Sequence, residues 1–197
     1  MMTFQKFIEQ IIDINEKEWN ETDIEFKKVH YKKGDIINKE GEVFRNIYFI
    51  NSGIVRSYFI DKEGRDFTWY IHYSSEQANM KNLFVVDYAS FIRQEPSKLF
   101  FEVIEDTELF SIDFNSIQKL YNLSAKWQKL GRLMADEGYY NIHHRTFSLL
   151  TENAKTRYKR LLKENPYLLQ IVPQYYIASY LGITPQSLSR IRKEYDK

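Results

Sequence analysis

The 197-residue sequence contains no cysteine. This absence excludes disulfide bonds, thiol redox sensing and iron–sulfur clusters held by cysteine. The sequence also lacks any apolar run near the roughly 18 residues that a membrane-spanning helix needs. The first twenty residues mix acidic side chains into apolar positions and have neither the basic start nor the apolar block of a signal peptide. We therefore expect a cytoplasmic protein without a membrane partner.

Signatures of catalytic and metal sites are also missing. There is no Gly-x-Ser-x-Gly motif and no glycine-rich phosphate loop, and the seven glycines fall mostly at turns. The four histidines are His30, His72, His143 and His144. None of them has a metal-ligand spacing, because neighbours such as His143 and His144 point about 100° apart on a helix. We expect no enzyme, no metal site and no bound cofactor.

Charge is distributed unevenly although the net charge is only +1. Between residues 152 and 197 there are nine Lys and Arg against four Asp and Glu, which leaves the preceding part of the chain acidic. A basic terminal segment on an acidic body favours nucleic acid as a partner. Hydrophobic residues make up 43% of the chain and aromatic residues 16%, so a substantial core is available.

After residue 20 the texture of the sequence changes to that of β-structure, and it turns helical again from Asn115. Turn signals at 33–35, 40–42, 51–53, 61–64 and 105–107 separate runs of alternating character at 45–50, 54–60, 67–71, 99–104 and 108–112. This spacing predicts an antiparallel sandwich or barrel with hairpin turns at 51–53 and 105–107. Large aromatic residues in these runs, such as Tyr48, Trp69 and Tyr70, are interpreted mainly as core, with some lining an effector pocket.

Helical patterns surround this region. Residues 3–20 are predicted to form one amphipathic helix, a short helix follows residue 115, and a long one runs over 124–150. The long helix has a partly apolar stripe formed by Trp127, Leu130, Met134, Asn141, Arg145 and Leu149. That stripe fits either pairing with a second copy or packing on the chain's own β domain. Thr151 is predicted to cap the next helix, which ends at Asn165-Pro166.

The segment 173–193 is the most informative part of the chain. Pro173 suits the first position of a short helix, and Gly182 supplies the left-handed residue that ends it. Thr184 and Pro185 suit the start of a second helix, whose buried side would carry Leu188 and another apolar residue three positions on. The outer face of this second helix is polar and cationic. The segment therefore predicts a helix-turn-helix whose second helix fits a DNA major groove.

The order of these elements resembles the Crp/Fnr family over nearly the whole chain. The marks that carry the resemblance are the runs 178–184 and 188–193, supported by Tyr31 to Asp35, Ile50 to Gly53 and Asp87 to Phe91. The resemblance implies an α+β chain whose N-terminal antiparallel β-roll is of the double-stranded β-helix or jelly-roll type, with flanking helices. It divides the chain into a cyclic-nucleotide-binding-like sensor (1–115), a connecting dimerisation helix (116–150) and a helix-turn-helix domain (151–197).

The resemblance also implies DNA-contacting residues on the second helix of the motif. Arg190 is expected to pair with guanine and Gln186 with adenine. Thr184 and Ser187 are expected at phosphates. The full set implied is Thr184, Pro185, Gln186, Ser187, Ser189, Arg190, Arg192 and Lys193. Partners implied are double-stranded DNA, a second copy of the chain, RNA polymerase and a small-molecule effector.

Two departures from the family pattern matter. Members that bind cyclic AMP hold its phosphate with a glycine–glutamate pair and then an arginine–serine pair, where this chain has Val86-Asp87 and Ser97-Lys98. Lys98 is a point charge without the fork of an arginine, so we expect no cyclic AMP binding. The candidate effector-pocket residues are Asp87, Tyr88, Ser97 and Lys98. The family's β-wing after the second helix is also expected to be absent or truncated.

These observations lead to two hypotheses. The first is a homodimeric transcription regulator that binds a pseudo-palindromic DNA site, with an unidentified effector in the β-roll. The second is a ligand-binding sensor that acts through a protein partner without sequence-specific DNA binding. Steep weakening of binding by salt is expected only for the first.

Overall fold

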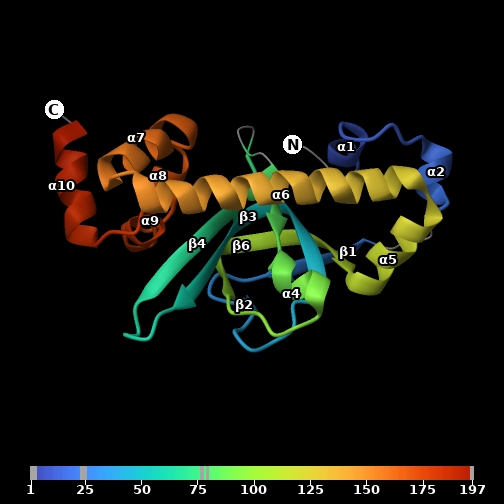
Figure 1. Ribbon diagram of the computed structural model, residues 1–197, viewed down its shortest axis with the longest axis horizontal. Helices are drawn as coiled ribbons and strands as arrows, with labels where there is room; N and C mark the ends of the chain where they lie inside the picture. Colours follow the sequence, from blue (N-terminus) through green and yellow to red (C-terminus); the bar gives the residue numbers. More distant parts are fainter. Residues whose placement is uncertain (1–3, 23–25, 76–77, 79, 196–197) are drawn as a thin grey trace.

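An antiparallel β-roll occupies the centre of the structure and a long helix crosses it (Figure 1). The computed structural model describes residues 4–22, 26–75, 78 and 80–195. The strands are β1 (Lys27–Tyr31), β2 (Ile36–Asn38), β3 (Asn46–Ile60), β4 (Asp66–Tyr73), β5 (Phe84–Val85) and β6 (Phe100–Asp113). Their order is β1-β6-β3-β4, with β2 paired to β6 and β5 to β3. The predicted α+β class with an antiparallel roll is confirmed.

The two longest strands correct the prediction of turns at 51–53 and 105–107. β3 and β6 run continuously through both segments and pair with each other, with register shifts between Ile50 and Val55. Gly53 has φ +96°, and a Cβ there would lie 2.3 Å from Thr107 Oγ1. The glycine signal therefore marks a bulge where the paired strands approach closely, because a bulge needs the same left-handed backbone as a tight turn.

The predicted single helix over 3–20 is also wrong. The structure has α1 (Phe4–Glu9) and α2 (Glu16–Asn20), with non-helical backbone between them. Asn15 begins α2 through a capping box: its side chain accepts from Glu18 N, and the Glu18 side chain accepts from Asn15 N. This local pairing starts a new helix after Asn15. The apolar spacing of residues 3–20, which suggested one long helix, is therefore shared by two short helices.

The remaining helices are α3 (Met80–Leu83), α4 (Tyr88–Arg93), α5 (Phe114–Leu123), α6 (Ala125–Thr151), α7 (Ala154–Glu164), α8 (Leu168–Ile171), α9 (Gln174–Tyr180) and α10 (Pro185–Tyr195). The helices α5, α6, α7, α9 and α10 correspond in order to predicted ones, whereas α3, α4 and α8 were not predicted. The cap of α7 differs from prediction. Asn153 accepts from Thr156 N at 2.9 Å and caps α7, whereas Thr151 is the last residue of α6 and donates to Phe147 O. As predicted, α7 ends just before Asn165-Pro166.

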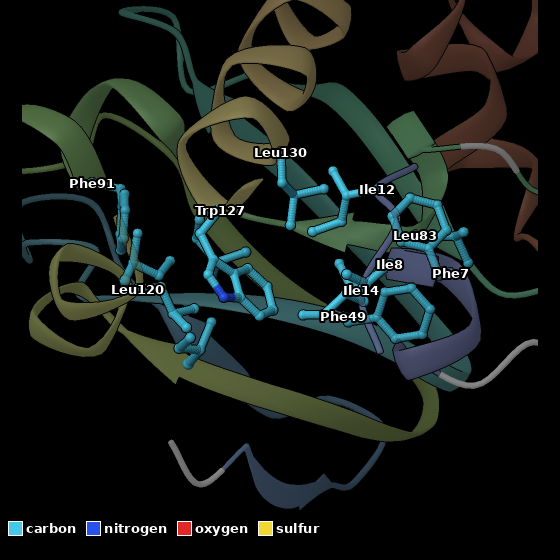
Figure 2. Packing of buried hydrophobic residues seen from close by; sticks show 13 residues of the cluster. Phe7, Ile8, Ile12, Ile14, Phe49, Leu83, Phe91, Leu120, Trp127 and Leu130 are labelled. Carbon is cyan, nitrogen blue, oxygen red and sulfur yellow. The ribbon is translucent and has the colours of Figure 1, made fainter. Parts of the chain in front are cut away.

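The N-terminal half of α6 is buried against the roll. Trp127 and Leu130 are buried, and Figure 2 shows them gathered with Ile8 of α1 and Phe49 of β3. Large aromatic and branched side chains of this size stabilise a core by about 1.5–3 kcal/mol each when fully buried. The packing fixes one end of α6, and the helix extends from there to the C-terminal helices at the other end of the molecule (Figure 1).

Candidate DNA-binding surface and its junction with the sheet

The C-terminal helices form a helix-turn-helix built from local signals. α9 ends at Tyr180 with Leu181 as its C-cap, and Gly182 follows with φ +68°. Thr184 Oγ1 then accepts from Ser187 N at 3.2 Å and caps α10. Leu188 and Ile191 are buried on the inner side of α10 and pack with Ile177 of α9. Pro173 lies one residue before α9 with an extended ψ of 136°, so it is the N-cap of that helix and not its first residue as predicted.

The outer face of α10 carries the residues expected to contact DNA. Thr184, Pro185, Gln186, Ser189, Arg190 and Lys193 are exposed, and Ser187 and Arg192 are half-buried. The face therefore combines hydroxyl, amide and guanidinium groups, and its only acidic residue is Glu194, which forms an ion pair with Lys155 at 2.5 Å. Such groups match the donors and acceptors of major-groove base edges and phosphates. The contacts of these residues with DNA stay a prediction.

The helix-turn-helix is docked on the free edge of β4. Ser179 Oγ of α9 accepts from Thr68 N at 2.7 Å and donates to Asp66 O at 3.0 Å. Arg145 of α6 donates to Thr68 O and to Tyr180 O, both at 3.0 Å. Two side chains from two helices thus satisfy both backbone polar groups of one edge residue, and they join α6, β4 and α9 at one point. Burial lowers the pKa of Arg145.

A buried arginine makes a second contact between the roll and α9. Arg56 of β3 is 4% exposed and pairs with Asp66 at 2.7 Å and Glu102 at 2.8 Å. Its guanidinium lies 3.9 Å from the ring centroid of Tyr58 and 3.8 Å from that of Tyr176 on α9. Two carboxylates compensate a charge that would otherwise be costly to bury, and the aromatic faces add cation–π attraction. Neither Arg56 nor Ser179 was singled out by sequence, since each acts through partners distant in the chain.

The C-terminal half of α6 has an exposed aromatic stripe. The rings of Tyr139, His143 and Phe147 follow one another at spacings of four, with centroids 6.2 and 6.3 Å apart, and Leu150 continues the line. Tyr139 is 73% exposed, Phe147 60% and Leu150 79%. We call these four residues the α6 stripe. Exposed apolar rows of this kind are typical of interaction sites.

This stripe differs from the one noted in the sequence. The sequence-derived stripe packs on the chain itself: Trp127 and Leu130 contact the roll, and Arg145 contacts β4 and α9. Of the two interpretations of that stripe, packing on the chain's own β domain is the one that the structure has. The α6 stripe lies on a nearly opposite face, because residues 141 and 143 are about 200° apart on a helix.

Comparisons with known proteins agree with this architecture. Residues 28–124 match the family described as Cyclic nucleotide-binding domain. Electron transport regulator A of Shewanella oneidensis is 23% identical over 187 residues, covering 89% of this chain and 71% of that protein. FixK2 from Bradyrhizobium japonicum has a TM-score of 0.72 at 20% identity, over 87% of this chain and 84% of its own. A crp/fnr family transcriptional regulator from Eubacterium rectale has a TM-score of 0.68 at 19% identity, over 93% of this chain and 84% of its own.

The chain has the Crp/Fnr fold. Its β-roll is the cyclic-nucleotide-binding-type domain of that fold, and α7 to α10 form the helix-turn-helix part. Among the described residues, no helix is both long and apolar enough to cross a membrane, and no group of three or more His, Cys, Asp or Glu could hold a metal ion.

The residues expected at the effector site do not all face one space. Asp87 caps α4, and its Oδ2 accepts from Ser97 Oγ at 2.7 Å. Ser97 is buried, Lys98 is exposed and Tyr88 is partly exposed. Tyr88 also lines a cavity of about 370 Å³ between the roll and α6, and Asp87, Ser97 and Lys98 do not line it. Tyr70 and His72 of β4 also line the cavity. Tyr70 belongs to the aromatic residues interpreted as core or pocket lining, whereas no pocket role was predicted for His72.

Proposed function

We propose that this protein is a homodimeric Crp/Fnr-type transcription regulator that binds double-stranded DNA through α10. The observation that carries the proposal is the outer face of α10, where exposed hydroxyl, amide and guanidinium groups stand on a helix anchored by Leu188 and Ile191. Such a helix fits the major groove, and the basic charge of residues 152–197 attracts phosphates. The protein acts by binding and not by catalysis, and it works in the cytoplasm.

The proposed roles of the α10 residues follow from their chemistry. Arg190 pairs bidentately with guanine and Gln186 with adenine. Thr184 and Ser187 contact phosphate near the helix N-terminus, where backbone N–H groups also favour anions. Pro185, Ser189, Arg192 and Lys193 complete the contact surface, and RNA polymerase is the expected further partner.

Dimerisation is proposed through the α6 stripe. Tyr139, His143, Phe147 and Leu150 form a row that a second α6 would cover, burying side chains that are otherwise in water. A two-fold pairing would present two α10 helices to successive major-groove faces about 34 Å apart. The target is therefore a pseudo-palindromic site. An effector in the roll would bias the arrangement of α6 and change DNA affinity, and cyclic AMP is not that effector.

Selection of binding sequences from random duplexes, followed by fluorescence anisotropy on the selected site, tests DNA recognition. Arg190→Ala is expected to weaken binding by about 1–3 kcal/mol, because one bidentate base contact is lost. Lys119→Ala is the matched control, since it removes an exposed cation from α5 at the far end of α6 (Figure 1). Equal affinity of Arg190→Ala and the wild type, or binding that does not weaken as salt rises, would contradict the proposal and favour a protein partner.

Sedimentation equilibrium tests the dimer. Phe147→Glu places a charge in the middle of the α6 stripe and is expected to yield monomers, because a buried unpaired carboxylate is strongly unfavourable. Lys119→Glu, at an exposed position of α5 away from the stripe, is expected to stay dimeric. A dimeric Phe147→Glu variant would show that another surface pairs the chains.

A further inference from the structure

The cavity between the β-roll and α6 has the size of a small-molecule site. Its volume of about 370 Å³ lies within the range of ligand pockets. β4 contributes Tyr70 and His72, while α6 contributes Met134, Gly138 and Ile142. The lining is mostly apolar and contains no Asp, Glu, Lys or Arg. Arg145 lies behind the Tyr70 ring, 5.4 Å from its centroid, but it does not line the cavity and donates to Thr68 O and Tyr180 O. A phosphate or carboxylate placed here would therefore have no charged partner in the lining, which makes a nucleotide a poor occupant.

Two buried polar atoms of the lining have no hydrogen-bond partner. They are Tyr70 Oη and His72 Nδ1, neither of which has a partner in normal hydrogen-bond geometry, although the Phe84 backbone lies close enough to the His72 imidazole to act on its pKa. The two residues are separated by one position on β4, so both side chains lie on the same face, with ring centroids 6.1 Å apart. His72 is only 5% exposed, and its other ring nitrogen, Nε2, lies 3.2 Å from Ser57 Oγ.

Unpaired buried polar atoms are rare in folded proteins, and each calls for an explanation such as an absent ligand. Burial lowers the pKa of His72 to about 4, although the Phe84 backbone acts in the opposite direction. The imidazole is therefore neutral at pH 7, and the phenol is neutral as well. Together they offer donor and acceptor capacity to one uncharged polar group.

Gly138 is the third unusual feature of the cavity. It lies in the interior of the 27-residue helix α6, where glycine disfavours helix formation. A Cβ at Gly138 would meet nothing within 4 Å, so close packing does not require the glycine. Gly131 on the same helix contrasts with it, because a Cβ there would lie 2.3 Å from Tyr121 Oη. The missing side chain at Gly138 enlarges the space beside α6.

We propose that the cavity binds a neutral, mainly apolar ring compound that carries one hydroxyl or carbonyl group between Tyr70 Oη and His72 Nδ1. This inference builds on the regulator function proposed above, because it names the class of effector. The cavity also touches the α6 stripe through Tyr139. A bound molecule would therefore contact the helix face used for pairing and the strand on which the helix-turn-helix is docked.

Isothermal titration calorimetry with four probes tests the ligand class. 1-Naphthol supplies two fused rings and one hydroxyl, naphthalene lacks the hydroxyl, and 1-naphthyl phosphate and cyclic AMP carry charge. 1-Naphthol is expected to bind one molecule per chain with a Kd below about 1 mM. Naphthalene is expected to bind about tenfold more weakly, because it leaves the two polar atoms unpaired. No binding of 1-naphthol, or stronger binding of either charged probe, would overturn the proposal.

Variants locate the site. Tyr70→Phe is expected to weaken 1-naphthol without changing naphthalene, since only the hydroxyl contact is lost. Gly138→Leu is expected to abolish binding of both by filling the cavity, whereas Lys129→Leu, on the exposed side of α6, keeps both. Unchanged 1-naphthol affinity in Gly138→Leu, with a wild-type circular dichroism spectrum, would also overturn the proposal. The titrations contain no DNA, so their failure is distinct from a failure of Arg190→Ala to weaken DNA binding.

Discussion

The buried histidine of β4 should make the protein lose stability in mild acid. His72 has a pKa of about 4 in the folded chain against an ordinary value of 6.5, and desolvation is the main cause. When the pH falls below 6.5, the unfolded chain binds a proton at this site and the folded chain does not, so protonation favours unfolding. Above pH 6.5 neither state is protonated there and the penalty disappears.

The size of the effect follows from the two pKa values. Each unit of difference between the unfolded and folded pKa corresponds to about 1.36 kcal/mol. Protonation of His72 should therefore lower the free energy of unfolding by about 3 kcal/mol between pH 6.5 and pH 4. Below pH 4 the penalty stays constant, because both states are then protonated. His72→Gln removes the titration while its amide can still reach Ser57 Oγ, the partner of Nε2.

Urea unfolding at a series of pH values measures this effect. The quantity of interest is the difference in unfolding free energy between wild type and His72→Gln. Carboxylates with lowered pKa values, such as those of Glu108 and Asp113, also cost stability at low pH, but they titrate in both proteins and cancel in the difference. Parallel profiles for the two proteins from pH 7 to pH 4 would refute the reasoning and would mean that the imidazole is solvated or paired.

Two further substitutions test the packing. Gly138→Ala is expected to raise the free energy of unfolding by about 0.5–1 kcal/mol, because alanine favours a helix interior and the new methyl group meets open space, whereas Gly131→Ala is expected to lower it by forcing the Tyr121 ring to move; thermal unfolding of the pair checks the sign of each. Arg56→Met is expected to cost about 3–5 kcal/mol by leaving two carboxylates without their cation, and a midpoint in urea close to that of wild type would contradict this account.

Sequence patterns predicted those parts of the fold that rest on short-range chemistry. The helix-turn-helix was recognisable because Gly182 and Thr184 end one helix and begin the next through contacts within a few residues. The bulge at Gly53 was misread as a turn, because its meaning depends on Thr107 across the sheet. The break between α1 and α2 was missed although the capping pair at Asn15 is local, since the apolar periodicity outweighed it.

The candidate sites divide in the same way. The exposed position of Arg190 on α10 follows from the helical spacing of Leu188 and Ile191, which a sequence displays directly. The cavity cannot be predicted from spacing, because Tyr70 on β4 and Gly138 on α6 line one space only when the helix crosses the roll. Periodicity also could not tell which face of α6 would be covered, since both faces carry aromatic residues.

The docking of α9 has a consequence for the sheet itself. β4 is a terminal strand in the order β1-β6-β3-β4, and its outward N–H and C=O at Thr68 are occupied by Ser179 and Arg145. An uncovered strand edge is a template for pairing with other chains. By covering this edge, the helix-turn-helix therefore also opposes aggregation through β4. Any rearrangement that lifts α9 from β4 must offer this edge another partner, or the protein becomes prone to strand-to-strand association while α9 and α10 are displaced.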